Sequence, residues 1–254
     1  MQRWKLTLQY DGLAFHGWQA QQDVATVQDT LETAIQGLCQ SSVRCHVAGR
    51  TDQGVHALGQ VAHVDIPRAL EPDQMRRAIQ AHLKGAPIAI VKAEPVSEAF
   101  HARFSATTRH YRYRIVQTAH PSVLHFGRAW WIARPLDRVA MQEAADHLLG
   151  YHDFSSFRAA GCQANHALRT LDRAEWYESI TNTGAREYTI EFSALSFLYH
   201  QVRNMVGSLV EVGIGQRKPQ DIADILAAKD RTQAGRTAPP EGLYFVGVDY
   251  DDSI

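Results

Sequence analysis

Helix-like and strand-like segments follow one another along this chain in two successive rounds, and their order restricts the folds open to it. Each round contains a strand, a helix and further strands that read as hairpin-like pairs. Helices place apolar residues at intervals of three and four, whereas strands alternate apolar and polar residues. This mixture predicts an α+β protein with a mixed, mostly antiparallel sheet flanked by helices. We expect a central cleft to run across that sheet.

The expected elements can be placed along the sequence. A strand over 3–10 ends at the turn dipeptide Asp11-Gly12. Thr26 caps a helix to about Cys39, with Asp29 in its first turn. The first half continues with strands over 43–48 and 60–66, a helix over 72–84 and a strand over 88–96. The second half has strands over 109–116, 168–178, 186–195 and 244–250, and helices over 136–149, 199–214 and 219–228. We therefore expect an N-terminal half, 1–100, and a C-terminal half, 101–254, that completes the sheet and the cleft.

Composition excludes several classes of protein. Of the 254 residues, 45% are hydrophobic and 21% charged, as in ordinary globular proteins. The longest apolar run, 205–215, is interrupted by Glu211 and is too short to cross a membrane. The first residues lack the apolar core of a signal peptide, and three cysteines argue against a disulfide framework. We expect a cytoplasmic protein that does not bind membranes.

The formal net charge of −1 conceals a basic segment. Between His101 and Arg138 there are seven arginines and a single acid, Asp137, with aromatic residues interleaved. Arginines neutralise phosphates and rings stack on unpaired bases, so this segment fits a groove for nucleic acid. An amphipathic strand with solvated arginines and buried rings is the alternative.

The most distinctive local motif is GRTDQG, from Gly49 to Gly54. Glycines let a ligand approach closely, so the loop would present Asp52 to a cleft. Arg50 is positioned to keep that carboxylate ionised. The alternative is an Asx turn, in which Asp52 binds its own backbone. A phosphate-binding P-loop is excluded because Val55 follows Gly54 where lysine is required.

Two other segments contain candidate site residues. In RHYRYRIV, Tyr111 lies on the ring-rich side, whereas Arg112 and Arg114 share the polar side and are candidate substrate contacts. Tyr111 is either a ring that stacks on a turned-out base or a core residue. The helix YHQVRNMVGSLVEVGI surrounds Arg203 with apolar residues, where a charge needs a partner such as an active-site carboxylate. The alternative is an exposed stripe formed by Arg203, Asn204, Gly207, Ser208 and Glu211.

A metal site is a further hypothesis. Cys45 and His46 lie near His56 and His63 in the sequence, which would suit a metal-dependent RNA hydrolase. No CxxC or HxxxH spacing supports zinc binding, so we favour a site without metal.

Several long motifs extend over almost the whole chain: AGRTDQGVHALGQVAH, FHARFSATTRHYRYRI, DFSSFRA with LRT, FLYHQVRNMVGSLVEVG and LAAKDRTQAGRTAPPEGLYFVGVDY. In this order they resemble the tRNA pseudouridine synthase A family, also called tRNA pseudouridine(38–40) synthases. The family motif usually has Ala at the position of Gln53 and Met at that of Gln201. Neither position is one to which the family assigns chemistry.

The resemblance implies an isomerase with the pseudouridine synthase fold. It would convert uridine to pseudouridine at positions 38, 39 and 40 of the tRNA anticodon stem-loop, without cofactor or metal. Asp52 is similar to the catalytic nucleophile, Tyr111 to the ring that stacks on the target base, and Arg203 to the basic partner of Asp52. Arg50 is a further contact in the same motif. The resemblance also implies a homodimer that binds tRNA across both subunits. A tRNA-binding module that has lost catalysis is the alternative, and the intact set of residues argues against it.

Overall fold

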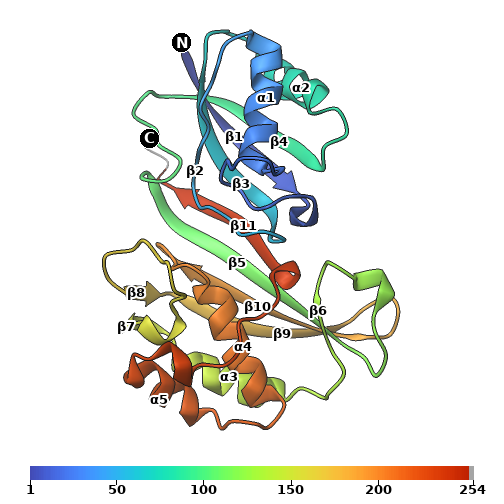
Figure 1. Cartoon of the computed structure of the whole chain (residues 1–254), viewed down its shortest axis with the longest axis vertical. Helices are drawn as coiled ribbons and strands as arrows, with labels where there is room; N and C mark the ends of the chain where they lie inside the picture. The colour runs from blue at the N-terminus through green and yellow to red at the C-terminus, as the bar shows by residue number, and fades with distance from the viewer. Residues whose placement is uncertain (252–254) are drawn as a thin grey trace. The chain divides into compact units, whose positions relative to one another are not determined.

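A computed structural model describes residues 1–251, which form two units (Figure 1). The first unit comprises Met1–Arg109 and the strand that begins at Tyr244, and the second is His110–Leu243. The expected halves place residues 101–109 and the closing strand in the second half. The structure assigns both to the first unit, because the closing strand β11 (Leu243–Tyr250) pairs in parallel with β3 (His56–Ile66).

The first unit is a sheet in the order β4-β1-β3-β11. Its strand β1 (Gln2–Tyr10) is antiparallel to both β3 and β4 (Ile88–Val96). Buried and more exposed residues alternate along β1, with Trp4, Leu6 and Leu8 in the core. The short strand β2 (His46–Val47) adds to β3 in antiparallel orientation. It is shorter than the expected strand over 43–48, because the chain then turns into the GRTDQG loop.

Two helices belong to the first unit, and both confirm the sequence-based expectation. Helix α1 (Val27–Cys39) begins at Thr26, whose hydroxyl accepts a hydrogen bond from the Asp29 N–H at 3.2 Å. Val27, Leu31 and Ile35 form its buried stripe. Helix α2 (Pro72–Leu83) starts at a proline, which has no N–H to leave unpaired, and packs against α1 and β4.

The second unit has its own strands. β5 (Ala106–Gln117) continues into it from the first unit and is followed in the sheet order by β10 (Arg186–Ala194) and β9 (Arg173–Ile180). β9 and β10 are antiparallel, and β6 (Trp130–Ile132) is parallel to β5. A separate pair joins β7 (Gly150–Asp153) to β8 (Leu168–Leu171). The expected strand over 168–178 is thus two strands, because its two parts pair with different partners.

Three helices complete the second unit: α3 (Arg138–Asp146), α4 (Gln201–Gly213) and α5 (Gln220–Ala228). Helix α3 packs against α4, α5 and β9. Single 3-10 turns lie at Gly12–Ala14, Val123–His125, Ser155–Phe157, Arg231–Gln233 and Pro240–Gly242. The expected α+β class, with a mixed sheet and flanking helices, is confirmed. Within residues 1–251, no helix has the length and apolar character needed to cross a membrane.

Candidate active site

Buried groups of the first unit hold the loop that contains Asp52. The Gln60 side-chain amide donates hydrogen bonds to the Gly49 carbonyl at 2.8 Å and to the Tyr10 hydroxyl at 3.3 Å. The Tyr10 hydroxyl lies 2.7 Å from that of Thr51. An amide nitrogen only donates, so the Tyr10 oxygen accepts from Gln60, and either hydroxyl can donate in the Tyr10–Thr51 pair. Burial raises the pKa of Tyr10 to about 12, so its hydroxyl keeps its proton at neutral pH.

A second segment, residues 12–18, lies against the same loop. The Trp18 N–H donates to the Thr51 carbonyl at 3.0 Å. A Cβ atom on Gly17 (φ +90°) would lie 2.8 Å from that carbonyl oxygen, and one on Gly12 would lie 2.1 Å from the Val55 carbonyl oxygen. Both positions therefore require glycine. The loop backbone is held from two sides. The sequence analysis named Gly12 only as part of a turn and did not identify Gly17.

The two charged residues of the loop differ in exposure. Asp52 is half-buried, and its carbonyl accepts a hydrogen bond from the Val55 N–H at 3.1 Å, which closes a turn. Arg50 is exposed and has no ion-pair partner within residues 1–251, so the expected pair with Asp52 is not formed. Its role as a contact in the site stays a prediction.

Arg109 is a structural residue, although it belongs to the basic segment seen in the sequence. Only 8% of it is exposed. Its guanidinium donates to the Ala48 carbonyl from Nε at 3.1 Å and from Nη2 at 3.0 Å, and Nη2 also donates to the Arg103 carbonyl at 2.7 Å. These donors satisfy the Ala48 carbonyl, directly before the Asp52 loop, and the Arg103 carbonyl, and are directed away from solvent.

Tyr111 and Tyr113, on the ring-rich side of β5, have different environments in the second unit. Tyr113 is fully buried and donates to the Pro239 carbonyl at 2.7 Å, so it is a core residue. Tyr111 is half-buried, and its ring meets that of Phe197 edge to face at a centroid distance of 5.1 Å. Of the two rings, Tyr111 is the one that retains exposed surface for a ligand.

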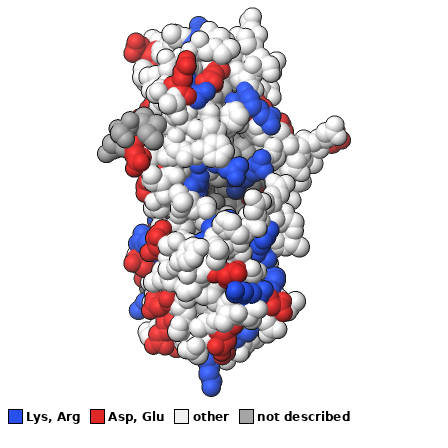
Figure 2. Space-filling view, turned by 90° about the vertical axis from the view of Figure 1, so that its left-hand side faces the viewer, with Lys and Arg blue, Asp and Glu red and all other residues white. Residues whose placement is uncertain are grey.

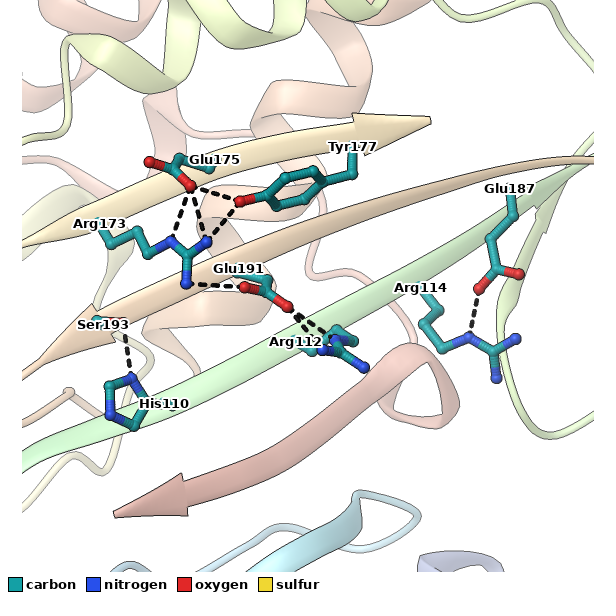
Figure 3. Close-up of polar contacts among 9 residues, drawn as sticks. All are labelled: His110, Arg112, Arg114, Arg173, Glu175, Tyr177, Glu187, Glu191 and Ser193. Atoms are coloured by element: carbon teal, nitrogen blue, oxygen red, sulfur yellow. Dashed lines mark hydrogen bonds and ion pairs between the residues drawn. The ribbon is translucent and has the colours of Figure 1, made fainter. Parts of the chain in front are cut away.

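Arg112 and Arg114 lie on the other side of β5 in a ladder of charges (Figure 3). Arg112 donates from Nη2 to Glu191 at 2.7 Å, and Arg114 donates from Nε to Glu187 at 2.5 Å. Arg173 binds the second oxygen of Glu191 at 2.8 Å. Each arginine already has a carboxylate partner from the neighbouring strand. A phosphate bound here would share its guanidinium with that carboxylate, and the substrate contact stays a prediction.

Arg203 lies in the first turn of α4, where two groups orient its guanidinium. Nε donates to the Ala238 carbonyl at 2.8 Å, and Nη1 lies 3.2 Å from Nε2 of His200. His200 caps the helix with φ +59°, in the left-handed region, and its ring stacks on Tyr199 at 3.9 Å. The sequence analysis did not identify His200, although its place three residues before Arg203 was a signal for contact.

The alternative interpretation of α4, an exposed polar stripe, is wrong. Asn204 and Ser208 are completely buried beneath the segment that follows α5. The Asn204 side-chain oxygen accepts from the Thr237 hydroxyl at 2.7 Å, and the Ser208 hydroxyl accepts from the Gly235 N–H at 2.9 Å. A Cβ on Gly207 would lie 1.7 Å from the Arg236 carbonyl oxygen. The small and polar residues of α4 therefore form the docking face for this segment.

The hypothetical metal site receives no support from the structure. Cys45 is buried, and burial raises the pKa of its thiol. His56 is buried and accepts a hydrogen bond from the Gly12 N–H at 3.1 Å. Residues 1–251 contain no group of three or more histidine, cysteine or acidic side chains arranged to hold an ion.

Figure 2 shows one face of the molecule, on which Lys and Arg side chains and acidic side chains both reach the surface.

Comparison with known proteins identifies the class of protein. A family model described as tRNA pseudouridine synthase matches residues 7–105 and 144–251. The chain belongs to the tRNA pseudouridine synthase family. The matched segments contain Asp52 and Arg203, whereas Tyr111 lies between them.

The relatives match this sequence over 98% or more of its length. The chain is 51% identical over 253 residues to tRNA pseudouridine synthase A of Paramagnetospirillum magneticum, covering 100% of this chain and 97% of that protein. It is also 51% identical over 253 residues to tRNA pseudouridine synthase A of Methylocella silvestris, covering 100% of both. The protein of the same description from Rhodospirillum rubrum is 50% identical over 248 residues, covering 98% of this chain and 87% of that protein.

Proposed function

We propose that this protein converts uridine to pseudouridine in tRNA, at positions 38, 39 and 40 of the anticodon stem-loop. The observation that carries the proposal is the full-length identity to proteins described as tRNA pseudouridine synthase A. The geometry of the first unit supports it. A half-buried carboxylate, Asp52, lies on a loop whose backbone is held by Gln60 and Tyr10 on one side and by Trp18 on the other.

The proposed reaction is an isomerisation within one nucleotide. The N1–C1′ bond breaks, the uracil turns while it stays bound, and a C5–C1′ bond forms, after which C5 loses its proton and N1 gains one. An ionised Asp52 assists by attacking C1′ or C6, or by removing a proton from the sugar. All three routes need the carboxylate in its charged form, which a nearby cation favours. We assign this cation to Arg203, whose guanidinium is held by Ala238 and His200.

Tyr111 is proposed to stack on the target base. A flat ring restrains a detached uracil and still allows it to rotate in its plane. The edge of Phe197 supports the Tyr111 ring from the side. Arg50 is proposed as a further substrate contact because it lies two residues from Asp52 and is exposed.

The protein is further proposed to act in the cytoplasm as a homodimer. Family resemblance supports the dimer.

The test is pseudouridine formation on unmodified tRNA by the wild type and by Asp52→Asn. We expect no turnover by the variant, with unchanged folding and tRNA binding, because the side chain is half-exposed and the amide has the same shape. Asp23→Asn is the matched control, since Asp23 is exposed and its left-handed backbone suits asparagine equally well. Turnover by Asp52→Asn at the wild-type rate would remove Asp52 from the mechanism.

A further inference from the structure

A tight turn in the first unit, His101–Ser105, presents an aromatic ring and a cation to solvent. Phe104 is 75% exposed, whereas nearby Phe100 is only 2% exposed. The Arg103 guanidinium lies 5.5 Å from the centroid of the Phe104 ring, within the range of a cation–π contact. An exposed phenylalanine beside an arginine gives a surface with both a π face and a positive charge.

The turn holds this ring on an ordered backbone. Nδ1 of His101 accepts hydrogen bonds from the N–H groups of Arg103, at 3.1 Å, and Phe104, at 3.3 Å. The His101 N–H donates to the Ser105 hydroxyl at 3.0 Å, and the Ser105 N–H donates to the His101 carbonyl at 2.9 Å. Four hydrogen bonds within five residues leave the backbone little freedom, so Phe104 projects from a rigid support.

The same turn is connected to the Asp52 loop. The buried Arg109 guanidinium binds the Arg103 carbonyl, in the turn, and the Ala48 carbonyl, directly before Gly49 of the loop. One planar group therefore sets the distance between the exposed ring and the loop that presents Asp52. A substrate that contacts both the Phe104 ring and the Asp52 loop is therefore held at a fixed position relative to Asp52.

We propose that the His101–Ser105 turn is an RNA-binding surface, on which Phe104 stacks on an unpaired base and Arg103 binds an adjacent phosphate. This inference rests on the proposed function, because it places the contact on the same tRNA that Asp52 acts on. Single-stranded RNA offers a base face and a phosphate within one nucleotide, which matches the ring and cation of the turn.

The lack of a carboxylate beside Arg103 favours a role in RNA binding over a purely structural role. Within residues 1–251, Arg103 has no carboxylate partner. A second ring–arginine pair, Tyr177 with Arg173, has similar geometry at 5.9 Å, but there the guanidinium binds Glu175 and Glu191. The pair at Tyr177 is therefore neutralised and serves as a control with a similar distance between ring and guanidinium.

The experiment measures dissociation constants for unmodified tRNA. Phe104→Leu keeps an apolar side chain but removes the ring, and Phe104→Tyr keeps the ring. We expect about tenfold weaker binding for Phe104→Leu, as for the loss of one stacked base, and near-wild-type binding for Phe104→Tyr. Tyr177→Leu should bind as the wild type does. Melting temperatures should agree among the variants, because both rings are exposed.

The charge is tested by a salt series. Arg103→Gln should reduce the slope of log K against log salt by roughly 0.7–0.9, the value for one phosphate contact, whereas Phe104→Leu should leave it unchanged. Unchanged slope and affinity in Arg103→Gln would overturn the phosphate contact.

A scan of abasic nucleotides through the anticodon loop identifies the stacked base. At one position the abasic change should weaken binding to the wild type and have no further effect on Phe104→Leu. The proposal is overturned if no position shows this coupling, or if Phe104→Leu binds tRNA normally. If Phe104→Leu binds tRNA with unchanged affinity but sediments with a lower mass than the wild type, the turn instead forms a contact between two copies of the protein. Failure of the proposed function is seen separately, as absence of pseudouridine formation by the wild type.

Discussion

Arg203 donates a hydrogen bond from Nη1 to Nε2 of His200 at 3.2 Å, so this imidazole nitrogen must be unprotonated. His200 has φ +59°, a conformation that costs a non-glycine residue about 1–3 kcal/mol. The strain places the ring against both Tyr199 and the guanidinium. We infer that His200 orients Arg203, a positioning role that glycine cannot fill.

Two substitutions of His200 separate backbone strain from orientation. His200→Gly removes the strain and the acceptor, whereas His200→Asn tolerates the same backbone and supplies an amide oxygen. Hydrogen bonds to charged groups contribute about 1.5–3 kcal/mol, so we expect His200→Gly to lower kcat by tenfold or more with little change in KM. His200→Asn should retain most of the rate. Equal or better turnover by His200→Gly would show that orientation by His200 is unimportant.

The hydroxyl of Thr51 should matter for both stability and turnover. Thr51→Val leaves the Tyr10 hydroxyl without its buried hydrogen-bond partner, at a cost of about 1–3 kcal/mol, whereas Thr51→Ser preserves the contact. We expect a lower melting temperature and a lower kcat for Thr51→Val, measured by thermal unfolding and pseudouridine release. Loss of the same size in Thr51→Ser would point to the methyl group instead.

Tyr111 tests whether a ring or a hydroxyl serves the reaction. If stacking on the base is its role, Tyr111→Phe should turn over near the wild-type rate and Tyr111→Ala should lose most of it. Steady-state kinetics on unmodified tRNA give the comparison. Equal losses in both variants would assign the role to the hydroxyl.

Acidification should destabilise the protein through His63. Burial, reinforced by the charges of His101, Arg3 and His46, lowers the pKa of His63 from 6.5 to about 4, while Asp65 opposes the shift. Between pH 6.5 and about 4, the folded state therefore binds fewer protons than the unfolded state. Its stability is unaffected by this group above pH 6.5 and falls as the pH decreases from 6.5 towards 4.

Melting temperature against pH checks this expectation. Nδ1 of His63 accepts from the Ala102 N–H, so His63→Asn keeps an acceptor and removes the titration. The variant should show a flatter curve between pH 6.5 and 4. The pKa of Asp65 is lowered below its ordinary value of 3.8, chiefly by the hydrogen bond with Arg3. Protonation of Asp65 therefore changes the stability only below the pH range in which the two curves are compared. Curves of the same slope would exclude His63 as the cause.

Arg112 and Arg114 are expected to contribute to tRNA binding through charge. Replacing both with Gln should weaken binding to all tRNAs alike and flatten the salt slope, by at most about 0.7–0.9 for each phosphate that is no longer bound. Their pairing with Glu191 and Glu187 should make the change smaller than for Arg103→Gln, because each phosphate shares its arginine with a carboxylate. A slope unchanged by the double substitution would remove these arginines from the interface.

Local patterns were sufficient to predict most helices and strands. Helix α1 follows from its cap at Thr26 and its apolar spacing, and the strand expected over 88–96 coincides with β4, Ile88–Val96. These features depend on residues close together in the sequence. Short elements such as β6 and β7 were missed, because three or four residues carry too little periodicity to recognise.

Pairings between distant residues were not predictable in the same way. The pairing of β11 with β3 joins Tyr244 to His56, and no pattern in either strand indicates its partner. For the candidate site, the sequence indicated Asp52 and Arg203 but not the groups that hold them, such as Gln60 or Ala238. An arginine buried for structural reasons also looks the same in sequence as one that binds phosphate, as Arg109 shows.

The second unit is one continuous stretch of chain, and the first unit is made of the two stretches on either side of it. During synthesis, the ribosome therefore releases the whole of the second unit before Tyr244 can reach His56. The nascent protein carries an unfinished sheet edge at β3 throughout that interval, so His56 and Ala57, shortly after the loop that contains Asp52, are among the last residues to gain their partners.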